Sequence, residues 1–380
     1  MARLGDICTV VSGSTPKTNI PEYWDGDVKW ITPAELNEDS FYLFDSQRHI
    51  SELGKEKTGL SYMPAGTVIL SSRAPIGKTA IAGCELCCNQ GFKNLICSDA
   101  IFNEYLYFFL KSKTDYLNSL GRGATFKEIS KSIVENIEIR LPSLEEQKKA
   151  AKQLGHIYHL ISLRKQQLQK LDELVKARFV ELFGTESEFD KWPCCTIGDV
   201  ADVCVGVVIK PTQYYTDKGI PAFRSLNIGE MRVKDSDWVY FTEEGHQKNQ
   251  KSVVHKNDVL VVRSGAPGTA CVATEKYDGY NAVDIIIAHP DNNKVNSIFL
   301  AAFTNMPHGM NQIRERTGGA AQQHFNVSGY KAMRLIMPSI ELQNHFAAFV
   351  KQTDKSKLAV QQSLNKLAIL KKSLMQKYFG

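Results

Sequence analysis

One long internal repeat constrains the fold of this chain more than any other feature of the sequence. The segment Leu4-Gly-Asp-Ile matches Ile197-Gly-Asp-Val at an offset of 193 residues, and Leu141-Pro-Ser-Leu matches Met337-Pro-Ser-Ile at an offset of 196. The offset of 196 then persists to the last residue of the sequence. Because this period far exceeds that of solenoid or propeller repeats, each copy is a domain-sized module rather than a stacking unit.

A third pair of matching segments combines apolar residues with a turn. Residues 66–77 and 257–268 each read as a β-strand followed by a Gly/Pro turn. Their Ala-Pro dipeptides are 192 residues apart, so we expect the second copy to lack one residue at Gly265-Ala-Pro-Gly-Thr, where no Lys corresponds to Lys78. The intervening stretches diverge strongly, which indicates a common scaffold with different surfaces.

Each copy ends in a predicted long amphipathic helix. Ser143 followed by Glu145 and Glu146 provides an N-cap and an acidic first turn, and Ser339 with Glu341 repeats the pattern. Apolar residues then recur at steps of three and four.

Such helices are longer than a small domain needs, because about 40 residues at about 1.5 Å each span about 60 Å. A helix that packs only on its own domain is the alternative, but the length and the duplication favour antiparallel pairing with one domain at each end. The predicted pairing residues are Leu168, Leu171, Leu174, Leu364, Leu367 and Leu370.

These patterns predict an α+β protein with pseudo-two-fold symmetry. It comprises two similar mixed α/β globular domains, residues 1–141 and 185–337, each followed by a long helix, residues 142–184 and 338–380.

The composition is that of an ordinary globular protein, with 43% hydrophobic and 23% charged residues, and the net charge of +5 permits a polyanionic partner. No apolar run is long enough for a membrane span and the start lacks a secretory signal, so we expect a cytoplasmic protein without membrane contact. The nine cysteines are scattered, which favours reduced thiols. Cys84 and Cys87 have the spacing of a zinc half-site, but no second pair follows, so no metal is predicted.

Five motifs are specific when taken together. They are Leu4-Gly-Asp-Ile, Ser71-Ser-Arg-Ala-Pro-Ile-Gly-Lys-Thr, Cys88-Asn-Gln-Gly-Phe-Lys, Gly121-Arg-Gly-Ala-Thr-Phe-Lys-Glu-Ile-Ser and Leu141-Pro-Ser-Leu-Glu-Glu-Gln. With the repeat and the helices, they resemble over essentially the whole chain the specificity subunits of type I restriction-modification enzymes. Those subunits carry two target-recognition domains separated by conserved long helices.

The resemblance implies that each globular domain reads one half of a bipartite, asymmetric target in double-stranded DNA. It also implies that the spacer helices set the interval between the half-sites and dock two methyltransferase subunits, which would carry S-adenosylmethionine. Nuclease and translocase activity would belong to restriction subunits. The chain itself is then expected to be non-catalytic and to hold no cofactor.

Loop Arg, Lys and amide side chains are the expected DNA contacts, because such groups bind phosphates or read base edges. The copies differ here too, since the segment that begins at Gly318 lacks the Thr and Ile-Ser spacing found after Gly121. The candidates are Lys17, Arg73, Lys78, Lys93, Arg122, Thr125 and Lys127 in the first copy, and Lys210, Arg224, Arg263, Arg314, Arg316, Gln322, Gln323 and His324 in the second.

Two other functions stay open at this stage, a stand-alone DNA-modifying enzyme and a coiled-coil adaptor that binds only protein. The segment Gly77-Lys78-Thr79 imitates a phosphate-binding loop, but Ser72 occupies the position of the required glycine. The aromatic run from Tyr105 to Phe109 is expected to pack in a core rather than to stack on bases.

Overall fold

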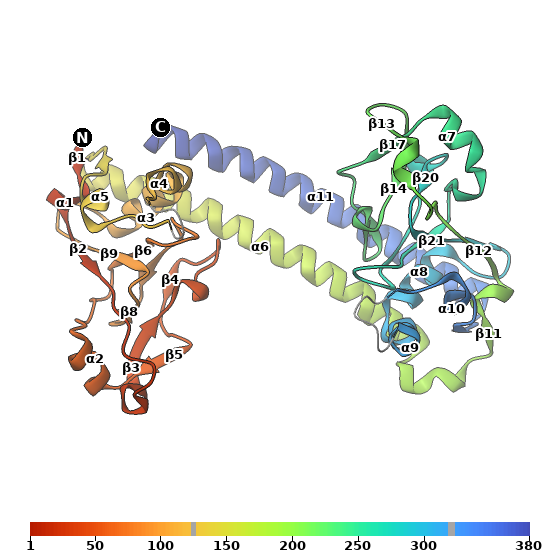
Figure 1. Cartoon of the computed structure of the whole chain (residues 1–380), viewed down its shortest axis with the longest axis horizontal. Helices are drawn as coiled ribbons and strands as arrows, with labels where there is room; N and C mark the ends of the chain where they lie inside the picture. Colours follow the sequence, from red (N-terminus) through yellow and green to blue (C-terminus); the bar gives the residue numbers. More distant parts are fainter. Residues whose placement is uncertain (123–126, 318–323) are drawn as a thin grey trace. The chain divides into compact units, whose positions relative to one another are not determined.

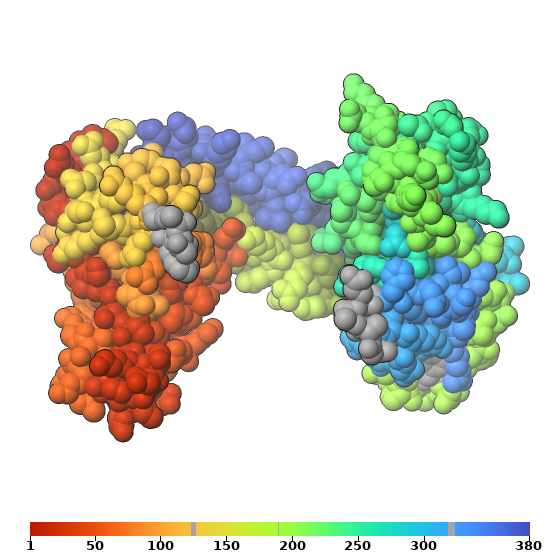
Figure 2. All heavy atoms as spheres, viewed as in Figure 1, coloured from red at the N-terminus to blue at the C-terminus, as the bar shows by residue number. Residues whose placement is uncertain are grey.

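The computed structural model describes residues 1–380 except for 123–126 and 318–323, and it forms two compact units (Figure 1). Unit 1 contains Met1–Gln166 and Gln361–Gly380, and unit 2 contains Gln167–Val360. Each unit therefore combines one globular domain with parts of both long helices. The surfaces of the units are drawn in the same colours in Figure 2.

Unit 1 is built on a five-stranded sheet of order β2-β9-β6-β7-β4. Helix α3 (Asn103–Ser112) packs on β6 and β7 and buries Tyr105, Tyr107, Phe108 and Phe109, which confirms the predicted core role of this run. The strands of this sheet are β2 (Cys8–Ser12), β4 (Tyr42–Leu43), β6 (Val68–Ser71), β7 (Thr79–Ala82) and β9 (Phe92–Cys97).

A smaller sheet of order β5-β3-β8 and several short elements complete unit 1. They are β1 (Ala2–Arg3), β3 (Trp24–Ile31), β5 (Arg48–Ile50), β8 (Cys87–Cys88), β10 (Glu138–Ile139), α1 (Leu4–Ile7), α2 (Glu52–Thr58), α4 (Thr114–Leu120) and α5 (Lys131–Glu135).

Unit 2 repeats this plan with a four-stranded sheet of order β12-β21-β18-β19. Helix α8 (Ser297–Asn305) packs on β18 and β19 as α3 packs on β6 and β7. The strands of this sheet are β12 (Ala201–Val205), β18 (Val259–Val262), β19 (Ala270–Val272) and β21 (Ile285–Pro290).

A second sheet of order β13-β17-β14-β20, the β15-β16 hairpin, the two-stranded β11-β22 sheet and further helices complete unit 2. They are β11 (Cys194–Thr196), β13 (Tyr215–Thr216), β14 (Ile220–Phe223), β15 (Ile228–Gly229), β16 (Arg232–Val233), β17 (Val239–Phe241), β20 (Asn281–Ala282), β22 (Arg334–Ile336), α7 (Glu243–Lys248), α9 (Pro307–Thr317) and α10 (Val327–Lys331).

The turn that follows β6 and β18 corrects one expectation from the sequence. The Ser71 N–H donates to the Lys78 carbonyl at 2.8 Å, and the Val262 N–H donates to the Thr269 carbonyl at 2.9 Å. Both turns therefore have the same length at a uniform offset of 191, and no residue is missing from the second copy. The expectation was wrong because the Ala-Pro dipeptide lies one position later in the second turn. Gly77 and Gly268 are the equivalent residues of the two turns, and their φ angles are 94° and 93°.

The two long helices are α6 (Leu144–Phe183) and α11 (Ile340–Phe379), and both lie within two residues of the predicted bounds. At the start of α6, Ser143 and Glu146 cap each other, with the Ser143 hydroxyl and the carboxylate 2.8 Å apart. This cap was expected, because serine followed three residues later by glutamate satisfies free N–H groups in the first turn.

The helices pack antiparallel inside each unit. In unit 1 the Tyr378 hydroxyl donates to Gln153 Oε1 at 2.6 Å, and the Lys371 ammonium lies over the Tyr158 ring. The partner residue number falls as the α6 number rises, which defines the antiparallel direction.

In unit 2, Lys357 pairs with Asp172 at 2.7 Å, and the Phe179 and Phe346 rings lie 5.5 Å apart. These contacts confirm the predicted fold class, including the antiparallel pairing.

The leucines predicted to pair the helices do not all lie on the packing face. Leu174 and Leu370 are 47% and 45% exposed, so their assignment was wrong. The neighbouring Val175 is buried instead, because the apolar stripe turns around the helix by one residue. The other four, which are half-buried, are Leu168, Leu171, Leu364 and Leu367.

Among the described residues, no helix combines the length and apolar character required to cross a membrane.

Candidate functional site

The turn after β6 and the turn after β18, residues 72–78 and 263–269, hold equivalent positions in the two units. We call each of them the strand-end turn. In unit 1 the Ile129 N–H donates to the Ser72 carbonyl at 3.0 Å, and in unit 2 the Phe325 N–H donates to the Arg263 carbonyl at 3.0 Å. Each turn is thus tied to the segment that follows the Gly-rich stretch of its own copy.

Side chains reinforce this tether in unit 1. Glu128 accepts a hydrogen bond from Arg73 Nε at 3.0 Å and one from Lys93 Nζ at 3.2 Å. Burial of the Glu128 carboxyl opposes ionisation, but the two cationic donors outweigh it and lower the pKa of Glu128. The glutamate is therefore held as a carboxylate between two basic side chains.

Different side chains make the tether in unit 2. Arg263 donates to Asp284 Oδ1 at 2.7 Å and to the Phe325 carbonyl at 3.1 Å, and its Nη2 lies 2.8 Å from His324 Nε2. A guanidinium has only donors, so His324 Nε2 accepts and its Nδ1 carries the proton. That Nδ1 lies 2.6 Å from the Ser264 hydroxyl, which completes the network.

These tethers occupy several side chains that we predicted to contact DNA. Lys93 and Arg263 are 6% and 9% exposed, so neither extends freely from the surface. Arg224 is half-buried, and its guanidinium donates to the Asp237 carbonyl. The sequence suggested loop positions for all three, but Lys93 lies within β9, and neighbouring carboxylates and carbonyls already engage these side chains.

Beside the strand-end turn of unit 1 lies a basic hollow of about 760 Å³, which we call the unit 1 hollow. Lys78 enters it from the turn, Lys111 from α3, Lys165 from α6 and Lys371 from α11. The Lys165 ammonium lies 3.0 Å from Asp39. Burial lowers the pKa of Lys111 to about 8, so a nearby anion would stabilise its charged form.

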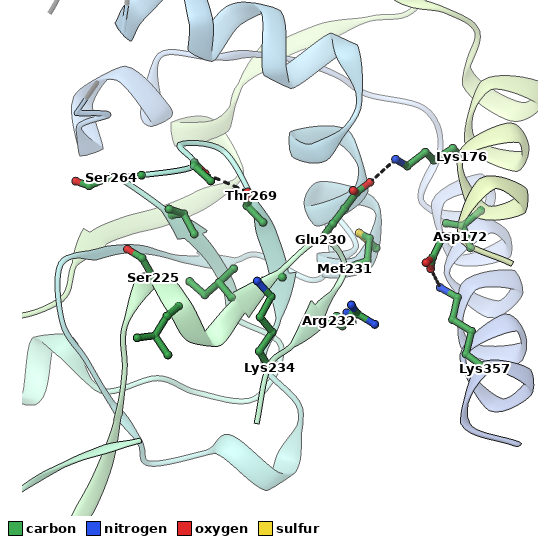
Figure 3. A pocket seen from close by; sticks show the side chains of 17 residues that line it. Asp172, Lys176, Ser225, Glu230, Met231, Arg232, Lys234, Ser264, Thr269 and Lys357 are labelled. Carbon is green, nitrogen blue, oxygen red and sulfur yellow. Dashed lines mark hydrogen bonds and ion pairs between the residues drawn. The ribbon is translucent and has the colours of Figure 1, made fainter. Parts of the chain in front are cut away.

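The unit 2 hollow has a volume of about 500 Å³ and lies beside the other strand-end turn (Figure 3). Arg232 and Lys234 reach it from the β15–β16 hairpin, and both are exposed. From the helices, Lys176 pairs with Glu230 at 2.8 Å, while Lys357 forms the ion pair with Asp172.

The hollows are equivalent under the repeat. Ala368 lines the first and Asp172 the second, an offset of 196, while Lys78 and Thr269 occupy matching places on the turns. Among their described lining residues, each hollow has four basic and two acidic side chains. An excess of cations in a concave surface attracts polyanions, and lysine and arginine are the usual ligands of nucleic-acid phosphates.

Most of the other predicted DNA contacts lie on the exposed surface, except Lys78, which is half-buried and donates to the Pro33 carbonyl at 3.2 Å. Arg314 and Arg316 lie on α9 and bond to groups of that helix. Thr125, Gln322 and Gln323 lie outside the described residues. The exposed ones are Lys17, Arg73, Arg122, Lys127, Lys210, Arg314, Arg316 and His324.

Sequence reasoning missed most of the basic side chains in the hollows. Lys165, Lys176, Lys357 and Lys371 lie on the long helices, which the sequence predicts to pair, to space the domains and to dock protein subunits, but not to contact DNA. A usable signal was present, because these lysines adjoin the apolar stripe of each helix, where a polar residue faces the edge of a packed domain. The missed residues are Lys111, Lys165, Lys176, Arg232, Lys234, Lys357 and Lys371.

Comparison with known proteins agrees with this architecture. A family model described as the type I restriction modification DNA specificity domain matches residues 1–173. The specificity subunit of the type I restriction enzyme MjaIX from Methanocaldococcus jannaschii is 34% identical over 284 residues, which cover 69% of this chain and 65% of that protein. The MjaVIII specificity subunit of the same organism is 23% identical over 278 residues, which cover 69% of this chain and 62% of that protein. The chain thus spans less than two thirds of the length of either relative.

Solved structures show the same fold. The S subunit of a type I restriction-modification system from M. genitalium has a TM-score of 0.60 at 15% identity, and the match covers 100% of this chain and 95% of that one. A chain from work on complex assembly and conformational transition of the type I R-M system has a TM-score of 0.56 at 16% identity, with coverage of 100% and 96%.

Proposed function

Because this chain belongs to the specificity subunits of type I restriction-modification enzymes, we propose that it is the non-catalytic, DNA-reading subunit of such a complex. Each globular domain reads one half of a bipartite, asymmetric target in double-stranded DNA. The observation that supports this role most strongly is the pair of equivalent basic hollows, one beside each strand-end turn.

The basic side chains of the hollows suit phosphate contacts, which would position the DNA, while the neighbouring loops would read its bases. Phosphate contacts place a protein on the duplex without selecting a sequence, whereas base contacts select it. The position of the hollow is common to both units, but the side chains around it differ, for example Lys78 against Thr269. A shared position for phosphate contacts with unlike neighbouring loops would give two half-sites of different sequence.

The long helices supply the remaining parts of the proposal. B-DNA presents its major groove on one face about every 34 Å, so a rigid helical spacer would determine the interval between two half-sites. The helices also expose large apolar side chains, which mark protein-binding surfaces when they cluster. We assign these helix surfaces, one in each unit, to two methyltransferase subunits that carry S-adenosylmethionine, with restriction and translocase subunits joining them. The exposed residues are Leu144, Leu160, Leu163, Ile369 and Leu370 in unit 1, and Leu174 and Leu358 in unit 2.

Genome-wide mapping of modified adenines tests the proposal most directly. The chain is co-expressed with its methyltransferase partner in a host that lacks other such systems. The expected result is one motif with two unlike halves and a constant gap. Modification by the chain without its partner would support a stand-alone enzyme, and a complex that binds no duplex would support a protein-only adaptor.

Lysine removal tests the hollows themselves. Lys78→Ala in unit 1 and Lys234→Ala in unit 2 should each weaken binding of the complex to every duplex tried. Each substitution should also reduce the slope of log affinity against log salt by about 1, because one phosphate contact is lost. Lys256→Ala is the matched control, since Lys256 is exposed and outside both hollows. An unchanged slope in both hollow variants would remove the phosphate role.

Arg263 is unsuitable for such a test. Its substitution would break the buried network of the strand-end turn, so a loss of DNA binding would not reveal a direct contact.

A further inference from the structure

Three chemically reactive side chains contact one another in succession at the main sheet of unit 2. Cys204 on β12 has its Sγ 3.6 Å from His289 Nε2, and His289 Nδ1 lies 2.7 Å from Asp258 Oδ1. His289 is on the adjacent strand β21, and Asp258 directly precedes β18. The arrangement is that of a thiol, an imidazole that faces it and a carboxylate that orients the imidazole.

The carboxylate of this group is well held. Asp258 is 3% exposed, and its second oxygen accepts a hydrogen bond from the His255 backbone N–H at 2.6 Å. The hydrogen bond with Asp258, followed by that with Cys204, raises the pKa of His289 to about 10, against a smaller opposing effect of burial. His289 is therefore an imidazolium near neutral pH, and its positive charge faces a sulfur atom.

Unit 1 shows that the fold does not require this group. At the equivalent sheet positions, Val11 replaces Cys204 and Ile96 replaces His289, both at an offset of 193. Thr67 stands in the place of Asp258 at the offset of 191. A sheet of the same strand order thus forms in unit 1 with apolar residues in the places of Cys204 and His289. The fold of unit 2 therefore does not depend on this polar group.

Other charged groups lie near Cys204 and His289, and each has a partner of its own. Asp202 precedes Cys204 on the same face of β12 and pairs with Lys331 at 3.7 Å. The His255 ring lies 6.1 Å from the His289 ring and contacts Asp278 at 3.5 Å. The thiol has one further partner, since Cys204 Sγ lies 3.2 Å from the Lys251 carbonyl. A carbonyl accepts a hydrogen bond from a neutral thiol, whereas an imidazolium stabilises a thiolate.

We propose that Cys204 is a nucleophilic cysteine and a site of oxidation by hydrogen peroxide and small peroxides. The thiolate sulfur attacks one peroxide oxygen, a sulfur–oxygen bond forms and the oxygen–oxygen bond breaks. The sulfur is oxidised by two electrons to a sulfenic acid, and the peroxide is reduced. The departing hydroxide, or alkoxide from an organic peroxide, takes the proton from His289 Nε2 and leaves as water or an alcohol, which returns the imidazole to its neutral form.

The half-buried position of Cys204 on the edge strand β12 agrees with this role. Reactive cysteines require both a cationic neighbour and access for a small reagent, whereas a fully buried thiol is inert. Cys271 on β19, at the opposite edge of the same sheet, is fully buried, and burial raises its pKa to about 12. The two thiols of the same sheet are therefore expected to behave in opposite ways.

The test measures peroxide oxidation of the purified full-length chain, with dimedone to capture the sulfenic acid and mass spectrometry to locate it. At one pH near neutrality, Cys204 should be labelled faster than Cys271, because Cys204 is half-buried beside a cationic imidazole whereas Cys271 is fully buried. Equal labelling of the two thiols would overturn the proposal, and this readout requires no variant.

Substitutions sharpen the result. His289→Ile introduces the residue that unit 1 already carries at this position, and it should slow the Cys204 reaction about tenfold or more near pH 6.5. Cys84 of unit 1 serves as the internal reference and should react equally in both proteins. Equal Cys204 rates in wild type and His289→Ile would contradict the proposal. The assay contains no DNA, so its outcome is independent of the proposed DNA-reading function.

Discussion

The two strand-end turns have the same backbone and almost unrelated side chains. Both close with the same pair of backbone hydrogen bonds and both are tied to the segment after the Gly-rich stretch. In unit 1 an exposed arginine and a buried lysine hold Glu128, whereas in unit 2 a buried arginine holds Asp284 and His324.

The difference shows that the geometry of this turn does not depend on a particular ion pair. Hydrogen bonds between backbone groups do not depend on side-chain identity, so the turn survives while its polar partners change. The hollows show the same contrast, because they hold equivalent positions in the two units but are lined by different side chains. Substitutions in the two units should therefore have unequal effects, and these differences can be measured.

The largest difference is expected at the ends of the long helices. Phe183 is 1% exposed and its ring contacts Phe179, Phe299 and Phe346. Phe183→Ala should lower the free energy of unfolding of unit 2 by about 3–5 kcal/mol, because it leaves a cavity in an aromatic core.

Phe379, its counterpart at an offset of 196, is 7% exposed and its ring contacts Tyr105 and Phe109, so Phe379→Ala should cost unit 1 less. Hydrogen exchange resolved by peptide measures each unit separately. Equal losses in the two units would show that the helix ends are energetically equivalent despite their different surroundings.

The second difference concerns the two arginines of the strand-end turns. The Arg263 side chain is 11% exposed, and Arg263→Ala would leave Asp284 without its cation, at a cost of about 3 kcal/mol. The Arg73 side chain is 45% exposed, so Arg73→Ala should cost less than about 1 kcal/mol.

Chemical denaturation of both variants measures these losses, with Arg314→Ala as a control, because Arg314 is exposed and donates to the Asn311 side-chain oxygen. If Arg73→Ala proved as costly as Arg263→Ala, burial would not be what distinguishes the two tethers.

The third difference is in the pH dependence of stability. The pKa of His289 is about 10 in the folded protein and about 6.5 in an unfolded chain. The resulting stabilisation is complete below about pH 6.5 and is lost as the pH rises through about 10.

Unit 1 has Ile96 at the equivalent position and cannot show this loss. The stability advantage of wild type over His289→Ile should therefore shrink between about pH 8 and pH 10.5, as read from denaturant midpoints at each pH. A constant advantage over this range would mean that His289 is not charged in the folded state.

Several features of the fold could be predicted because they follow from local rules. The Ser143–Glu146 cap, the helix bounds and the burial of Tyr105 to Phe109 depend on spacing and capping within a few residues. The register error at the second turn arose because Ala-Pro is a conspicuous dipeptide, whereas a backbone turn is defined by hydrogen bonds and by glycine at positive φ. The exposure of Leu174 and Leu370 shows a limit of the same kind, because a helical stripe predicts a face only to within about one residue.

The sequence by itself determined the duplication, the two long helices and the family, since these depend on order and spacing along the chain. Tertiary structure alone decided which basic side chains are engaged and which are available, because ion pairs form between residues far apart in sequence. Arg263 meets Asp284 and His324 only when three separate segments come together. The hollows and the Cys204–His289–Asp258 group arise in the same way, from neighbouring strands and helices whose side chains become neighbours only on folding.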